Sequence, residues 1–188
     1  MSLKISIVYG STRLGRLGIR LAKYITNEIN SQNFEATLID PLEYNFPLLF
    51  KRLSDYHEEE KPKKMLDLQS IFNDTDAFIL VSAEYNHMPP PALINLINYY
   101  SAEYNRKIST VCTYSSGDFA GVRVQSPLRA MLTQLGCPCI KYGMFQPNIA
   151  KNFNENGRAI DPVDAKKRFN IFFNELVWYA KALKKERA

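Results

Sequence analysis

The chain has 188 residues, of which 46% are hydrophobic and 23% charged, and its formal net charge is +5 at pH 7. This composition is ordinary for a globular protein with one large core, so we expect a single domain over residues 1–188. No run approaches the ~18 apolar residues of a membrane span and no secretory signal begins the chain, which predicts a cytoplasmic protein without a membrane partner. The basic residues are scattered, which argues against a nucleic-acid partner.

Cysteine and histidine usage indicates a reducing compartment and no metal site. Cys112 lies in an apolar run, and Cys137 and Cys139 flank one proline, a spacing unlike that of a zinc or thioredoxin motif. The two histidines, His57 and His87, are too few for a dedicated metal centre. We therefore expect no bound metal.

Strand and helix patterns alternate along the first half of the chain. A β-branched run begins at Lys4 and ends at Gly10, and apolar residues spaced four apart then predict a helix. The acidic run Asp55–Glu60 is typical of a solvated face. The patterns that follow the first helix predict a strand at Phe34–Ile39, a loop with one or two helical turns at Leu42–Pro62, a helix at Lys63–Phe72 and a buried strand at Ala77–Val81.

The second half continues the alternation. Three prolines at 89–91 suit the first turn of a helix that carries Leu93, Leu96 and Ile97 inward. The remaining patterns predict a strand at Lys107–Thr113, a helix at Val122–Leu135 ended by Gly136, a fifth strand at Cys139–Phe145 and a long helix at Pro162–Lys184.

Such alternation predicts an α/β fold, an open five-stranded parallel sheet in the order 2-1-3-4-5 with helices on both faces. A ligand of such a sheet lies beyond the carboxyl ends of the strands, where the strand order reverses. The loops Gly10–Gly18, Ala83–Pro90 and Ser115–Gly121 should therefore meet at one site. These three loops carry most of the hydroxyl, amide and guanidinium groups that could bind a ligand there.

The three loops together fit a mononucleotide. The first supplies Ser11, Thr12 and Arg13 close to a helix N-terminus, which suits phosphate, and the second supplies Tyr85 for a flat ring. Neither a Walker A motif nor the dinucleotide glycine pattern is present, although Asp40 could imitate the ribose-binding acid of dinucleotide sites. Ser11 and Thr12 could instead merely cap the first helix, and Tyr85 could be a buried wall residue.

Four motifs resemble the NADPH-dependent FMN reductase family, flavodoxin-like flavoproteins that include quinone, azo-dye and chromate reductases. The resemblance covers residues 4 to about 147 and implies a flavodoxin-like three-layer sandwich. The motifs are Gly10-Ser11-Thr12-Arg13 with Gly15-Arg16 and Gly18, Glu84-Tyr85-Asn86 before a proline-opened helix, Ser116-Gly117, and Ala120-Gly121-Val122-Arg123.

The resemblance implies bound FMN, reduced by NADPH or NADH and reoxidised by quinones, azo dyes, metal ions or free flavin. It implies no catalytic side chain, because the flavin carries the hydride chemistry. The resemblance places the phosphate of FMN in the first loop, its isoalloxazine ring against the second loop, and the pyrimidine edge of that ring near the third loop. The implied cofactor-binding residues are Ser11, Thr12, Arg13, Gly18, Glu84, Tyr85, Asn86, His87, Ser115, Ser116, Gly117 and Asp118.

Some features depart from the family pattern or leave alternatives. Ala83 and Ala120 stand where the family often has proline and glycine. We expect Asp118 to cap a helix near Phe119 and Arg16 to face solvent or a second subunit.

The family's subunit contacts imply a homodimer or homotetramer. A flavodoxin-type electron carrier and a non-enzymatic partner-binding module are the competing functions.

Overall fold

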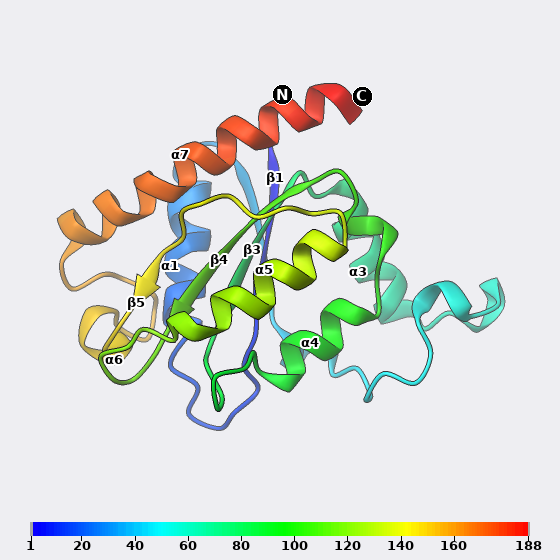
Figure 1. Cartoon of the computed structure of the whole chain (residues 1–188), viewed down its shortest axis with the longest axis horizontal. Coiled ribbons are helices and arrows are strands. Elements are labelled where there is room, and N and C mark those ends of the chain that lie inside the picture. The colour runs from blue at the N-terminus through cyan, green and yellow to red at the C-terminus, as the bar shows by residue number, and fades with distance from the viewer. Residues whose placement is uncertain (1, 188) are drawn as a thin grey trace.

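The computed structural model describes residues 2–187, and its five strands form one sheet in the order β2-β1-β3-β4-β5 (Figure 1). Every neighbouring pair is parallel, which confirms the predicted order. The strands are β1 (Lys4–Tyr9), β2 (Glu35–Ile39), β3 (Ala77–Ser82), β4 (Ile108–Tyr114) and β5 (Phe145–Gln146).

Helices cover both faces of this sheet. One face packs against α1 (Ile19–Asn30) and α7 (Pro162–Arg187), and the other packs against α3 (Lys63–Asp74), α4 (Pro91–Asn98) and α5 (Gln125–Gln134). The shorter elements lie in the connections: α2 (Pro41–Tyr44), α6 (Ile149–Asn152) and the 3₁₀ helices η1 (Leu53–Asp55), η2 (Glu58–Glu60), η3 (Ala102–Tyr104) and η4 (Val122–Val124).

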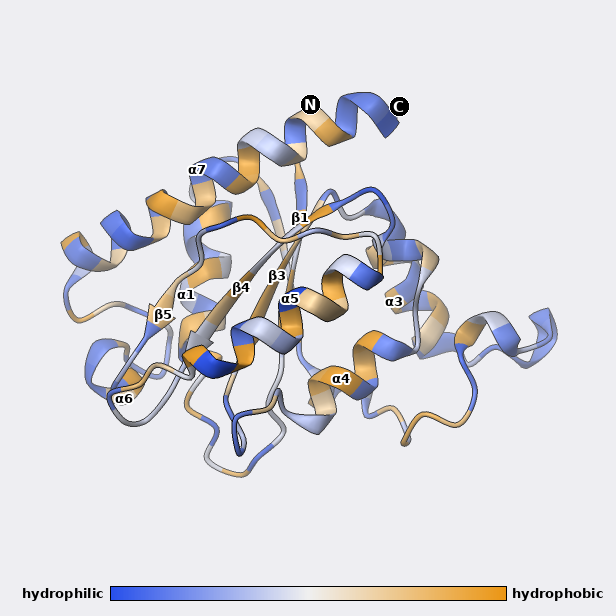
Figure 2. Cartoon of the chain, in the orientation of Figure 1, coloured by the Kyte–Doolittle hydropathy of each residue, from blue (hydrophilic) through white to orange (hydrophobic). Residues whose placement is uncertain are grey.

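Two hydrophobic cores result from the alternation of side chains along each strand. Ile5 and Ile7 of β1 point into the core beneath α1 and α7, whereas Val8 points into the core beneath α3, α4 and α5. β3 and β4 are buried along their whole length. The central strands are accordingly hydrophobic, and the helices carry both hydrophobic and hydrophilic residues (Figure 2). This packing fixes the strand ends from which the loops emerge.

The fifth strand is present, but its predicted bounds, Cys139–Phe145, are wrong, because β5 spans only Phe145–Gln146. Cys139 makes a single bridge to Ser109. Between Cys139 and Phe145, Arg129 donates to the carbonyls of Ile140 and Lys141, and the Thr110 hydroxyl donates to the Tyr142 carbonyl. These side-chain bonds occupy carbonyls that a regular strand ladder would use, while backbone bonds to β4 remain at Ile140 and Met144.

The helix predicted from Val122 begins later. Residues Val122–Val124 form η4, and the α-helix starts at Gln125. Pro127 explains the change, because a proline deep inside an α-helix would clash with the carbonyl four residues earlier, whereas the first turn of a helix tolerates it. The carboxyl end of this helix agrees better with the sequence, as Gly136 follows it with a φ of 71°.

Candidate functional site

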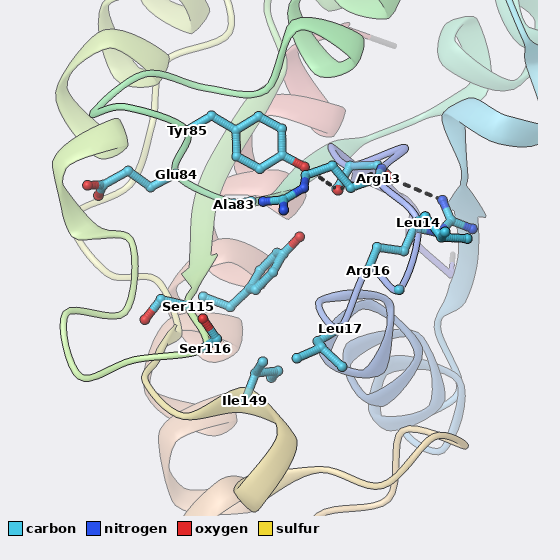
Figure 3. A pocket seen from close by; sticks show the side chains of 13 residues that line it. Arg13, Leu14, Arg16, Leu17, Ala83, Glu84, Tyr85, Ser115, Ser116 and Ile149 are labelled. Carbon is cyan, nitrogen blue, oxygen red and sulfur yellow. Dashed lines mark hydrogen bonds between the residues drawn. The ribbon is translucent and has the colours of Figure 1, made fainter.

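Three loops at the carboxyl edge of the sheet surround a cavity of about 250 Å³ (Figure 3). They follow β1, β3 and β4, and the strand order reverses between β1 and β3, so this cavity lies where open α/β sheets bind ligands. Its walls are formed by Ser11, Arg13, Leu14, Gly15, Arg16, Leu17, Ala83, Glu84, Tyr85, Tyr114, Ser115, Ser116 and Ile149.

The structure brings six of the twelve sequence-predicted residues to this cavity. The six that line it are Ser11, Arg13, Glu84, Tyr85, Ser115 and Ser116. The other six lie behind the wall, at the tips of the loops or in a neighbouring hollow, for reasons that differ from loop to loop.

The β1–α1 loop presents backbone N–H groups that have no partner. Helix α1 begins at Ile19 with Gly18 as its N-cap, and no side chain caps it. Within residues 2–187, the amides of Leu17, Gly18 and Ile19 donate to no acceptor. The helix start is therefore not capped by Ser11 or Thr12, and its unpaired amides suit an anion.

Ser11, Arg13 and Tyr85 join the first loop to the second. The Ser11 and Tyr85 hydroxyl oxygens share a hydrogen bond of 2.6 Å, and the Arg13 guanidinium lies 5.4 Å from the centre of the Tyr85 ring. Tyr85 is half-buried and Arg13 exposed. No carboxylate pairs with Arg13 among residues 2–187, so its charge is available to a ligand.

Tyr114 supplies a wall that the sequence prediction missed. Its hydroxyl lies 3.1 Å from that of Tyr9, and burial raises the pKa of both phenols, which keeps them neutral hydrogen-bonding groups. The ring packs so closely on Gly18 that a Cβ there would lie 1.8 Å from it. Gly18 is therefore needed for the close approach of Tyr114 and does not itself line the cavity.

Arg16 turns inward to Asp40, so the prediction that it faces solvent is wrong. Its guanidinium makes a two-pronged ion pair with Asp40 at 2.5 Å and donates to the Ser11 carbonyl at 2.9 Å. The hydrogen bond from Arg16 to Asp40 raises the pKa of the guanidinium further, so it stays charged. Asp40 is buried and also accepts from the Leu42 amide, which leaves it no role as an open ribose-binding acid.

The second loop turns sharply at Asn86 and His87. Both have positive φ, 51° and 66°, and the Met88 amide donates to the Tyr85 carbonyl, as in a type I′ turn. Their exposed side chains lie at the tip and outside the cavity lining. Glu84 lies on the wall, but its carboxylate points away from Arg13 and Leu17 (Figure 3).

That carboxylate ties the second loop to the third. Glu84 accepts from both the amide and the guanidinium of Arg123, at 3.1 and 3.3 Å. A second type I′ turn precedes Arg123, where Ala120 and Gly121 have φ values of 54° and 64° and the Val122 amide donates to the Phe119 carbonyl. The third loop is thus held by its own turn and by Glu84.

Asp118 does not cap a helix, which corrects the prediction. Its carboxylate accepts from the Asn148 side chain at 2.7 Å, and η4 begins at Val122, with Gly121 as its N-cap and no side-chain cap. Gly117 also lies outside the lining, and its carbonyl accepts from the Asn148 amide. These two residues attach the third loop to the segment after β5, which brings Ile149 to the cavity.

Thr12 is separated from its neighbours in the loop. It is exposed and lines a second hollow of about 220 Å³ together with Leu42 and Asn95, on the α2 and α4 side of the loop. The prediction grouped it with Ser11 and Arg13 because they are adjacent in sequence. The conformation of the loop instead divides the three residues between two hollows.

Some lining residues had a sequence signal and others had none. Leu14, Gly15 and Leu17 belong to the predicted first loop, and Tyr114 directly precedes the third, so their position along the chain could have identified them. Ile149 lies in a stretch that reads only as turn-rich. It reaches the cavity because its amide donates to the Ser115 carbonyl.

Residues 2–187 form neither a cluster of metal ligands nor a helix suited to crossing a membrane. Nowhere in that range do three or more His, Cys, Asp or Glu side chains gather closely enough to ligate a metal ion. None of the helices formed by these residues combines the length and apolar character that a membrane crossing requires.

Comparison with known proteins finds relatives of this chain in sequence and in fold. The sequence model of the family described as NADPH-dependent FMN reductase matches residues 3–150, while no curated protein matches the chain in sequence. Among solved structures, FerB, a flavoenzyme NAD(P)H:(acceptor) oxidoreductase from Paracoccus denitrificans, is 19% identical over 97% of this chain and 98% of its own, with a TM-score of 0.71.

Two further solved structures show the same fold. An azoreductase from Bacillus anthracis str. Sterne is 14% identical over 97% of this chain and 99% of its own, with a TM-score of 0.53. A flavodoxin variant from Pseudomonas aeruginosa is 16% identical over 97% of this chain and 99% of its own, with a TM-score of 0.56. The fold is therefore flavodoxin-like, as the motifs implied.

Proposed function

The chain belongs to the NADPH-dependent FMN reductase family, and from this membership we propose that it holds FMN in the cavity at the carboxyl edge of the sheet. The observation that carries the proposal is the pairing, in one cavity, of an anion-binding end with a ring-binding end. Unpaired amides and the Arg13 guanidinium form the first end, and Tyr85 with the third loop forms the second.

The groups present fit FMN chemically. Arg13 would offset the phosphate charge, and the amides at the start of α1 would donate hydrogen bonds to it. The Tyr85 ring offers a flat surface, and the Ser115 and Ser116 loop offers polar groups for a heterocycle edge. The lining carries no pair of carboxylates or nucleophile–base arrangement, which is consistent with chemistry that belongs to the cofactor.

FMN, when bound, accepts a hydride from a nicotinamide and passes electrons to an acceptor. We propose NADPH or NADH as the donor, and quinones, azo dyes, metal ions or free flavin as acceptors. The likeness to FerB, a flavoenzyme NAD(P)H:(acceptor) oxidoreductase, supports this reaction class. We also propose a homodimer or homotetramer in a cytoplasmic setting.

The decisive experiment is optical. The protein is incubated with FMN, desalted, and its visible spectrum recorded, after which any released flavin is identified. The bound flavin should then bleach anaerobically with NADPH or NADH and regain its colour when a quinone is added. A protein that stays colourless after incubation contradicts the proposal, and bound FMN that neither nicotinamide bleaches would indicate an electron carrier instead.

A further inference from the structure

Two arginines of the β1–α1 loop have opposite surroundings. Arg13 is exposed and lies over the Tyr85 ring without a carboxylate partner among residues 2–187. Arg16 is mostly buried, with a side chain 18% exposed, and is paired with the buried Asp40. Both arginines line the cavity, yet only Arg13 carries a charge that is not already balanced.

The donors of the Arg16 guanidinium are largely used within the protein. One terminal nitrogen donates to both Asp40 and the Ser11 carbonyl, and the other donates to the second Asp40 oxygen. The guanidinium carbon lies 5.2 Å from the centre of the buried Tyr9 ring. The three N–H groups used in these bonds could serve a phosphate only if Arg16 left Asp40 as a buried carboxylate without its charged partner, which is strongly unfavourable.

The bond to the Ser11 carbonyl has a consequence for the loop. In a trans peptide the carbonyl and the following N–H point in opposite directions. Arg16 draws the Ser11 carbonyl toward itself, so the Thr12 amide is turned away from Arg16, and this amide has no acceptor among residues 2–187. Asp40 in turn is fixed at the end of β2 by the Leu42 amide.

We propose that Arg16 and Asp40 are a positioning pair that holds the β1–α1 loop in its phosphate-binding shape, and that Arg16 is not itself a phosphate ligand. This inference rests on the proposed FMN site and adds to it a division of labour between the two loop arginines. Arg13 supplies charge to the ligand, whereas Arg16 supplies geometry to the loop.

The test compares the affinity for FMN with that for riboflavin, which lacks the phosphate. Asp40→Asn and Arg16→Gln should each weaken FMN binding by roughly tenfold or more, and the double variant should be no weaker than the single ones. Riboflavin affinity should stay within about twofold of the native value. Glu28→Gln, which breaks the Lys166 ion pair on the far half of α1, is the matched control and should leave both affinities unchanged.

Two results would contradict the proposed positioning role of Arg16 and Asp40. If Asp40→Asn leaves FMN affinity unchanged or tightens it, Arg16 is either idle or a phosphate ligand restrained by Asp40. Arg16→Lys is a milder substitution that keeps the positive charge but loses the two-pronged geometry. It should weaken FMN binding as much as Arg16→Gln does. Native FMN affinity in Arg16→Lys would also contradict the proposal.

A separate readout distinguishes this inference from the proposed function. Inorganic phosphate should raise the unfolding temperature of the native protein and fail to do so in Asp40→Asn. If the native chain binds no flavin but shows this phosphate effect, the proposed function fails and the positioning pair stands. If phosphate has no effect on the native protein, the inference fails as well.

Discussion

Two buried aspartates lie at opposite edges of the sheet and serve different ends. Asp40, 6% exposed, follows β2 at the carboxyl edge and pairs with Arg16 of a loop that lines the cavity. Asp76, 4% exposed, precedes β3 at the amino edge and accepts from the Lys4 amide, Lys184 and Arg187. One aspartate shapes a loop, and the other fastens the end of α7 to the sheet.

Polar groups at the amino edge of the sheet bind parts of the fold together, whereas some polar groups at the carboxyl edge stay unpaired. At the amino edge Lys107 donates to the carbonyls of Phe72 and Asn73, which end α3, so polar groups there bind parts of the fold together. At the carboxyl edge the turns include left-handed residues such as His87 and Ala120, and amides remain unpaired. Changes at the amino edge should therefore alter stability, and changes at the carboxyl edge should alter ligand affinity.

The largest effect is expected from Asp76→Ala. Loss of this carboxylate leaves Lys184 and Arg187 without their buried partner and should lower the free energy of unfolding by about 3 kcal/mol. Chemical denaturation measures the change. Asp74→Ala, which breaks the exposed pair with Lys4, is the neighbouring control and should change stability little. Weakened FMN binding in a folded Asp76→Ala protein would contradict the separation of the two edges.

The second test concerns pH. Burial, with a smaller contribution from nearby Arg187, lowers the pKa of Lys107 from its ordinary 10.5 to about 8. The folded protein therefore releases this proton before the unfolded chain does, and stability should rise with pH between about 8 and 10.5. The native protein should gain about 1 to 2 kcal/mol from pH 7 to 9.5 relative to Lys107→Met. An identical pH profile in the two proteins would refute this assignment.

Arg13→Ala examines the carboxyl edge. Removal of the exposed, unbalanced guanidinium should weaken FMN binding roughly tenfold through the lost charge-assisted contact, with the free energy of unfolding unchanged. Quenching of flavin fluorescence gives the affinity. Lys181→Ala on the exposed face of α7 removes one positive charge far from the loop and serves as the control. Native flavin occupancy in Arg13→Ala would count against the site assignment.

The smallest effect is expected from Ala120→Gly. Alanine at a φ of 54° costs free energy that glycine does not, so the substitution should stabilise the protein by about 1 kcal/mol or slightly less. Thermal unfolding measures the gain. Asn33→Gly, at a φ of 62°, should gain less because asparagine tolerates the left-handed region better. A destabilised Ala120→Gly protein would show that the packing of the buried methyl group outweighs the backbone strain.

Patterns of neighbouring residues in the sequence predict most of the fold and the edge of the sheet that carries the site. Side-chain periodicity indicated four of the strands and the long helices, connection rules indicated the strand order, and the polar loops after β1, β3 and β4 indicated the edge that carries the site. These features depend on residues close together in the chain. These features can therefore be predicted from the amino-acid sequence alone.

Contacts between segments that are distant in the sequence determine the features that the sequence did not predict. The Arg16–Asp40 pair, the Tyr114 ring against Gly18 and the arrival of Ile149 at the cavity each join parts of the chain that no local pattern links. The fifth strand is shorter than predicted, and Arg129 of α5 donates to two of the carbonyls that the predicted strand would have used. Such contacts form only when the layers have packed, so the folded arrangement decides which loop residues face the ligand and which hold the loop.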